Sequence, residues 1–174
     1  RGLVCVEVEL AALKAPLHSG MWGGPVPDCV GTLCRILGSL ADERGVPRVP
    51  GLSAGIRPVG ATERADWGRL PYTPAWFAQV AGLLDPAAAP ADAVAAHTAL
   101  WRAPAVSING IQAGVRGKVG NVLMDAAWAR LGVRIVPDQD PVAVEAALIA
   151  HLRAQVPAGM RLEIHRHSVS PAWG

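Results

Sequence analysis

The chain has 174 residues, of which 51 % are hydrophobic and 17 % charged, with a formal net charge of +2. This length fits one domain with a sizeable core. The small net charge gives no support for a nucleic-acid or anionic-membrane partner, and no apolar run is long enough to cross a bilayer. Three cysteines without close CxxC spacing favour buried thiols in a cytoplasmic protein over a disulfide scaffold or a structural zinc site.

The first predicted elements are a strand and a helix. Apolar and polar side chains alternate over residues 3–10, which is the pattern of a half-buried strand. After a Gly/Pro-rich loop over 16–26, Asp28 precedes apolar residues at spacings of three and four, which predicts a helix that begins near this residue. Residues 44–103 are rich in Gly, Pro and Ala and are predicted to be an insertion of loops and short helices.

The second half of the chain predicts two strands, a helix and a last strand. Residues 106–111 are a short strand candidate, and residues 122–136 a long one whose even-numbered face carries Arg134. A helix begins at Asp140, and alternation resumes over 160–164. The resulting order predicts an α+β fold, a ferredoxin-like β-α-β-β-α-β sandwich. Its four-stranded antiparallel sheet would carry two helices on one face, with the helical insertion added.

Three polar residues are candidates for a site. His18 lies in a glycine-flanked loop, and an imidazole can donate a hydrogen bond to an oxyanion, although such a residue alone is more often a surface histidine. Arg134 can bind a carboxylate through two hydrogen bonds or be an exposed strand residue. Asn121 can hydrogen-bond a substrate through its amide. His165 and His167 share a strand face, but we expect a frayed, solvated tail there with no carboxylate nearby.

Known catalytic and nucleotide-binding motifs are missing from the sequence. It contains no nucleophile elbow of a serine hydrolase, no phosphate-binding loop and no dinucleotide-binding fingerprint. No set of His, Asp and Glu residues has the number and spacing of a zinc centre. The residues of this chain therefore predict no metal site.

Four segments carry a resemblance to a known family. They are Leu-His-Ser-Gly-Met-Trp-Gly-Gly-Pro-Val-Pro at 17–27, Trp-Arg-Ala-Pro with Ser-Ile-Asn-Gly over 101–110, Asn-Val-Leu-Met at 121–124, and Arg-Ile-Val-Pro-Asp-Gln-Asp-Pro at 134–141. In this order they resemble the lid and dimerisation domain of the zinc-dependent aminoacylase and carnosinase-like metallopeptidases, peptidase family M-twenty. The long insertion resembles the carnosinase and cytosolic dipeptidase branch.

The resemblance implies that residues 1–174 are a single lid and dimerisation domain of a longer enzyme. The start at Arg1 without a methionine fits an excised part. The catalytic domain, outside this chain, would hold two zinc ions, and this chain would bind none and hydrolyse nothing by itself. His18 would stabilise the tetrahedral intermediate in the active site of the partner subunit. Asn121 and Arg134 would hold the terminal carboxylate of the substrate.

The partners implied by the resemblance are a second copy of the chain, the parent catalytic domain and a substrate. The substrate would be a dipeptide, a longer peptide with a free carboxylate, or an N-acyl amino acid. For the homodimer we expect the helix over 28–42 and a neighbouring strand edge to pair. The order of elements alone also allows a stand-alone ferredoxin-like ligand-binding domain, or an oligomerisation module without catalysis.

Overall fold

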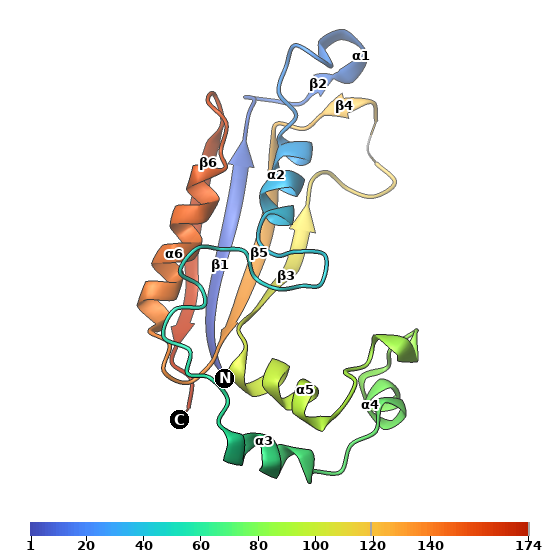
Figure 1. The fold of residues 1–174 in the computed structure, drawn as a ribbon. Helices are drawn as coiled ribbons and strands as arrows, with labels where there is room; N and C mark the ends of the chain where they lie inside the picture. Colours follow the sequence, from blue (N-terminus) through green and yellow to red (C-terminus); the bar gives the residue numbers. More distant parts are fainter. Residues whose placement is uncertain (119, 174) are drawn as a thin grey trace.

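The body of the molecule is a four-stranded antiparallel sheet with the order β3-β5-β1-β6, shown in Figure 1. The computed structural model describes residues 1–118 and 120–173. The strands are β1 (Gly2–Ala11), β3 (Ala105–Gln112), β5 (Ala126–Ile135) and β6 (Arg161–Ser170). Helices α2 (Cys29–Gly38) and α6 (Pro141–Ala154) cover one face of this sheet. The predicted α+β, ferredoxin-like fold is therefore confirmed.

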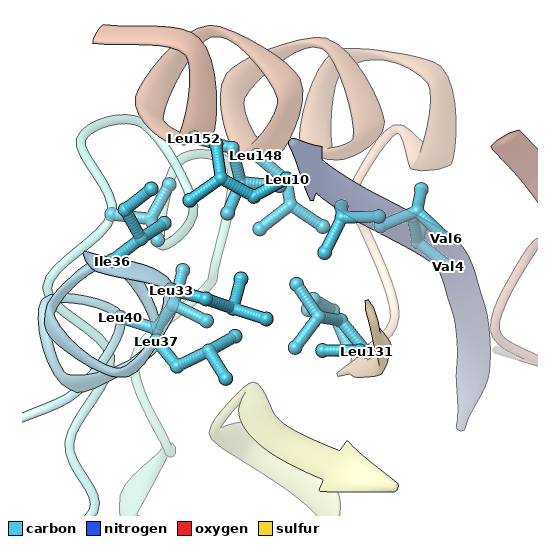
Figure 2. Packing of buried hydrophobic residues seen from close by; sticks show 14 of the residues in the cluster. Val4, Val6, Leu10, Leu33, Ile36, Leu37, Leu40, Leu131, Leu148 and Leu152 are labelled. Atoms are coloured by element: carbon cyan, nitrogen blue, oxygen red, sulfur yellow. The ribbon is translucent and has the colours of Figure 1, made fainter. Parts of the chain in front are cut away.

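The core lies between the sheet and these two helices. Every second side chain of β1 is fully buried, from Val4 to Leu10, and the same alternation buries Leu131 of β5. Helix α2 packs on β1 and β5, while α6 packs on β1 and β6. Figure 2 shows the leucines of both helices gathered in this layer with Leu10 of β1 and Leu131 of β5. None of the described helices covers the opposite face of the sheet, and we call it the open face.

Both helices begin where the sequence predicts, because an aspartate caps each one. The Asp28 carboxylate accepts a hydrogen bond from the backbone nitrogen of Val30 at 2.9 Å, and Asp140 accepts one from Val142 at 2.9 Å. Each bond pairs an N–H group that the first helical turn leaves without an intrahelical acceptor. Pro141 at the first position of α6 lacks an N–H group and its backbone angle suits a helix start.

The predicted long strand over 122–136 is wrong, because the chain breaks at Met124 and Asp125. Val122–Leu123 forms a separate strand, β4, which pairs with β2 (Leu17–His18) in a second, two-stranded sheet. The break comes from tertiary hydrogen bonds: the Asp125 carbonyl accepts from Ala12 N at 2.9 Å, and the Met124 carbonyl accepts from a cysteine thiol of α2 at 3.1 Å. We call the β2–β4 pair the tip sheet.

The last strand is also longer than the sequence predicts. Residues 165–170 lie in β6, and all of them except His167, which falls at a bulge, pair with β1 up to the Leu3–Ser170 pair. The expected frayed tail around His165 and His167 is therefore wrong. The pairing with β1 holds these residues in the sheet, although polar side chains give the segment no clear alternation.

The predicted insertion is helical and lies at the end of the sheet opposite the tip sheet (Figure 1). It contains α3 (Ala61–Gly68), α4 (Pro74–Ala81), the short 3-10 helix η1 (Pro86–Ala88), α5 (Ala93–His97) and the π-helical turn η2 (Thr98–Arg102). Aromatic rings hold α3 to the last two elements: Trp67 lies 5.5 Å from Trp101, and His97 lies 4.2 Å from Trp101 between ring centroids. The tip sheet continues into the single-turn helix α1 (Ser19–Trp22). No helix in the described ranges is long and apolar enough to cross a membrane.

Gln139 connects the insertion to the body of the fold. Its side chain is buried, and its Nε2 donates to the carbonyl oxygen of Leu52 at 2.7 Å while its Oε1 accepts from Val136 N at 3.0 Å. Both partners are backbone groups of irregular segments. Without this side chain they would stay unpaired in the interior.

We predict that Gln139→Leu lowers the free energy of unfolding by about 2–4 kcal/mol, because leucine fills the space but leaves a buried donor and a buried acceptor unpaired. Urea denaturation of the two proteins measures the difference. The control is Gln155→Leu at an exposed position at the end of α6, which should change stability by less than about 0.5 kcal/mol. Equal effects of the two substitutions would contradict the role assigned to Gln139.

Candidate functional site

His18 is exposed on the tip sheet, and a backbone hydrogen bond fixes the state of its ring. Its Nδ1 accepts a hydrogen bond from the backbone nitrogen of Gly20 at 3.1 Å. A neutral imidazole has one acceptor nitrogen and one N–H donor, so the proton lies on Nε2. His18 therefore presents a hydrogen-bond donor at the end of the ring that is not tied to the backbone.

Gly20 makes room for this ring. A Cβ atom at position 20 would lie 2.8 Å from Cε1 and 3.1 Å from Nδ1 of His18. Real Cβ atoms essentially never come that close to another heavy atom, so any larger residue would push the ring away. Within the glycine-flanked loop noted in the sequence, position 20 therefore requires glycine to leave space for the His18 ring.

Asn121 lies beside His18 because of the tip sheet. Its carbonyl oxygen accepts a hydrogen bond from Ser19 N at 2.8 Å, and the next residue, Val122, pairs with His18. The two predicted residues come from segments that are about 100 positions apart in the sequence. The short β2–β4 pairing brings them together at one end of the molecule (Figure 1).

Arg134 lies far from this pair within one chain. It stands on the open face near the end of β5, between Leu3 of β1 and Ala105 of β3. From Ala126, where β5 leaves the tip, to Arg134 the strand advances about 3.4 Å per residue, or ~27 Å in all. A single chain therefore does not bring Arg134 to the same ligand group as His18 and Asn121.

Arg134 lines a hollow of about 400 Å³ in the open face. The lining residues come from three strands: Leu3, Cys5, Ser107, Asn109, Arg130, Gly132 and Arg134. Partial burial lowers the pKa of Arg1, and the positive charge of Arg134 lowers it further. Among the residues that the structure describes, none forms an ion pair with Arg134. The hollow therefore has an excess of positive charge that suits an anionic group.

The other arginine of the hollow is already neutralised. Arg130 forms a salt bridge with Glu7 at 3.5 Å and contacts the ring of His167 at 3.1 Å. Glu7 is also the pairing partner of His165 across β1 and β6. The expectation that no carboxylate lies near these histidines is therefore wrong.

Among the described residues, no group of side chains has the composition of a zinc centre. In the two described ranges, no three His, Cys, Asp or Glu side chains come close enough together to hold a metal ion. The three cysteines are free, with Cys5 and Cys29 buried and Cys34 exposed. Zinc chemistry would require ligands from outside the described residues.

The family follows from comparison with known proteins. A family model described as the peptidase dimerisation domain matches residues 1–160. The chain belongs to this family. The dimerisation domain is 28 % identical over 171 residues to the cysteinylglycine-S-conjugate dipeptidase of Corynebacterium striatum, covering 94 % of this chain and 34 % of that protein. It is 27 % identical over 156 residues to the Beta-Ala-His dipeptidase of Rattus norvegicus, covering 88 % and 31 %.

Solved structures agree with this assignment. Human carnosine dipeptidase 1 has the same fold with a TM-score of 0.85 at 22 % identity, covering 97 % of the dimerisation domain and 36 % of that chain. The metallo-carboxypeptidase Sso-CP2 from Sulfolobus solfataricus has a TM-score of 0.81 at 27 % identity, covering 95 % and 42 %. The resemblance seen in the four sequence segments is confirmed. The dimerisation domain spans about a third of the length of the curated relatives.

The sequence analysis did not identify Asn109 as a residue of the hollow. Asn109 lies in its lining next to Gly132, but the sequence suggested no role for it. A signal was present, because Asn-Gly at 109–110 and a lone glycine at 132 interrupt strands, and such glycines mark bulges or close approaches of the backbone.

We predict that neutral His18 carries its proton on Nε2, because Nδ1 accepts from Gly20 N. The ¹⁵N chemical shifts of the ring, assigned by comparison with a His18→Gln variant, report which nitrogen is protonated. In Gly20→Ala the added methyl group should displace the ring and produce a mixture of tautomers. Gly120→Ala, where a Cβ meets no atom within 4 Å, should leave the signals unchanged. A proton on Nδ1 in the unmodified protein would contradict the arrangement.

Proposed function

We propose that this chain is the lid and dimerisation domain of a two-zinc metallopeptidase. The catalytic domain, which holds the zinc ions, would lie outside residues 1–174. Membership of the peptidase dimerisation family and the coverage of about a third of each dipeptidase relative support this assignment. The substrate would be a dipeptide or a related peptide or N-acyl amino acid with a free carboxylate. The domain alone would hydrolyse nothing, because no group of its described side chains fits a zinc centre.

His18 would act on the oxyanion of the tetrahedral intermediate. Its Nε2–H donor is directed by the hydrogen bond from Gly20 to Nδ1. A preoriented donor stabilises negative charge as it develops on the former carbonyl oxygen, and removing one such donor typically costs about 10²–10³ in turnover. The exposure of His18 on its own chain is consistent with a role in another subunit.

The separation of ~27 Å along β5 is the observation that carries the two-subunit assignment. His18 and Asn121 share the tip sheet, whereas Arg134 belongs to the open-face hollow. We therefore assign His18 and Asn121 to the active site of the partner subunit. Arg134 would bind the terminal carboxylate in the site of its own subunit. One substrate then contacts both copies, which explains why dimerisation would be required for activity.

The edge at β3 is the surface we propose for the dimer. Ile108 and Ile111 of this edge strand are 49 % and 51 % exposed. They pair with Leu131 and Ala129, so they point to the helix side of the sheet. Helix α2 packs mainly on β5 and β1 and leaves these two isoleucines of β3 exposed on that side. An apolar edge next to a helix is a natural site for a second copy, which would add its own strand and helix.

A stand-alone binding or oligomerisation module without catalysis is the alternative. The open-face hollow is the observation that favours it, because an anion could bind there without any catalytic domain. The parent gene on both sides of this segment separates the two hypotheses. His-x-Asp and Asp-Glu-Glu runs in the flanking sequence would support the peptidase, and their absence would support the module.

We predict that His18→Ala and Arg134→Ala each lower the turnover of the full-length enzyme more than tenfold while zinc content and dimerisation stay intact. In a reassorted equal mixture of the two variants, half of the dimers are mixed. Each mixed dimer contains one site with both an intact His18 and an intact Arg134. Activity should therefore return to about a quarter of the unmodified level.

The matched control mixes His18→Ala with Asn121→Ala. Both residues belong to the same tip sheet and would enter the same site from one chain. No mixed dimer then contains an intact pair, so activity should not return. Recovery in the control, or no recovery in the first mixture, would sink the two-subunit assignment.

We predict that the double substitution Ile108→Lys and Ile111→Lys shifts the full-length enzyme from dimer to monomer, because two buried charges would face the partner. Sedimentation velocity measures the change, and circular dichroism checks that the fold is retained. The control is Val142→Lys, an exposed residue of α6 away from β3. A dimer that survives the double substitution would exclude this edge.

A further inference from the structure

Asn109 reaches the open-face hollow because of a β-bulge. The pairing of β3 with β5 shifts register between Ile108 and Gly110, which leaves Asn109 as the extra residue. A bulge changes the direction of a side chain and is common next to functional sites. Here it places the Asn109 carboxamide among the residues that line the hollow, together with Arg134.

Gly132 on the neighbouring strand makes this placement possible. A Cβ atom at position 132 would lie 2.6 Å from Oδ1 and 3.6 Å from Cγ of Asn109. The carboxamide therefore lies directly over the bare backbone of β5, where any other residue would displace it. Gly132 is two positions from Arg134, so both face the same side of the sheet.

The polar groups of Asn109 and Arg134 are available for a ligand. Over residues 1–118 and 120–173, neither side chain forms a hydrogen bond to another residue. A carboxamide has two N–H donors, and a guanidinium has five in a planar fork. A carboxylate that accepts two bonds from the fork still has lone pairs for a further donor.

We propose that Asn109 is a further substrate-binding residue, which donates a hydrogen bond from Nδ2 to the terminal carboxylate held by Arg134. This inference rests on the proposed function and adds to it a residue that discriminates free carboxylates from amides. A carboxylate has two acceptor oxygens, enough for the guanidinium of Arg134 and for Nδ2 of Asn109, whereas a terminal amide has only one acceptor oxygen for these two donors. The bulge and Gly132 would hold the carboxamide in place before the substrate arrives.

The test is calorimetric binding to the full-length enzyme. The probe is a dipeptide with a reduced peptide bond, which cannot be hydrolysed, as its free acid and as its C-terminal amide. Asn109→Ala should weaken binding of the free acid about tenfold, with little effect on the amide. Asn109→Asp keeps a side chain of the same shape over Gly132, but its negative charge repels the carboxylate of the substrate. It should therefore weaken binding of the free acid further.

Gln112→Ala is the matched control, because it removes a carboxamide from the same face of β3 outside the hollow. It should leave binding of both probes unchanged. Equal weakening of the acid and the amide by Asn109→Ala, or normal binding of the acid by Asn109→Asp, would overturn the role of Asn109 alone. Failure of the unmodified enzyme to bind either probe would instead overturn the proposed function, and this inference with it.

Discussion

The antiparallel pairing of β1 with β5 is the constraint on which the rest of the structure depends. It runs without interruption from the Gly2–Ile135 pair to the Ala11–Ala126 pair. At one end it sets Arg134 beside the start of β1. At the other end both strands leave the sheet together, and their continuations form the tip sheet. A shift of one residue would turn Arg134 toward the core and move the whole buried set of β5 to the open face.

The same pairing places the core residues and the candidate site residues on opposite faces of the sheet. On the covered face, the buried side chains of β1 and β5 pack against α2 and α6 and supply the core. The open face carries charged pairs such as Glu7 with Arg130, and the hollow around Arg134. Because side chains alternate between faces, substitutions in the hollow need not disturb the core. The bulge at Asn109 is a local exception to the alternation, and it lies in the hollow.

Local periodicity and capping were enough to predict β1, α2, α6 and the ferredoxin-like order of elements. They failed at Met124, because the apolar alternation is interrupted only at Asp125 and resumes at Ala127, and the hydrogen bonds that cause the break come from Ala12 and Cys29. They failed for β6 because its pairing with β1, and not its own pattern, holds it in the sheet. The candidate site shows the same limit. Its residues were found by type and motif, but their distances depend on long-range strand pairing.

The separation of the two groups of residues also constrains the form of the proposed dimer. Because β5 is an extended strand paired within the sheet, the tip sheet and Arg134 of one chain stay ~27 Å apart. If two copies meet at β3 about a two-fold axis perpendicular to the sheet, their edge strands run antiparallel. The tip sheet of one copy then lies toward the end of the other copy that carries Arg134. One chain therefore cannot form a complete substrate site, because its tip sheet and its Arg134 are too far apart. Antiparallel pairing of two copies would bring the tip sheet of one copy close to Arg134 of the other.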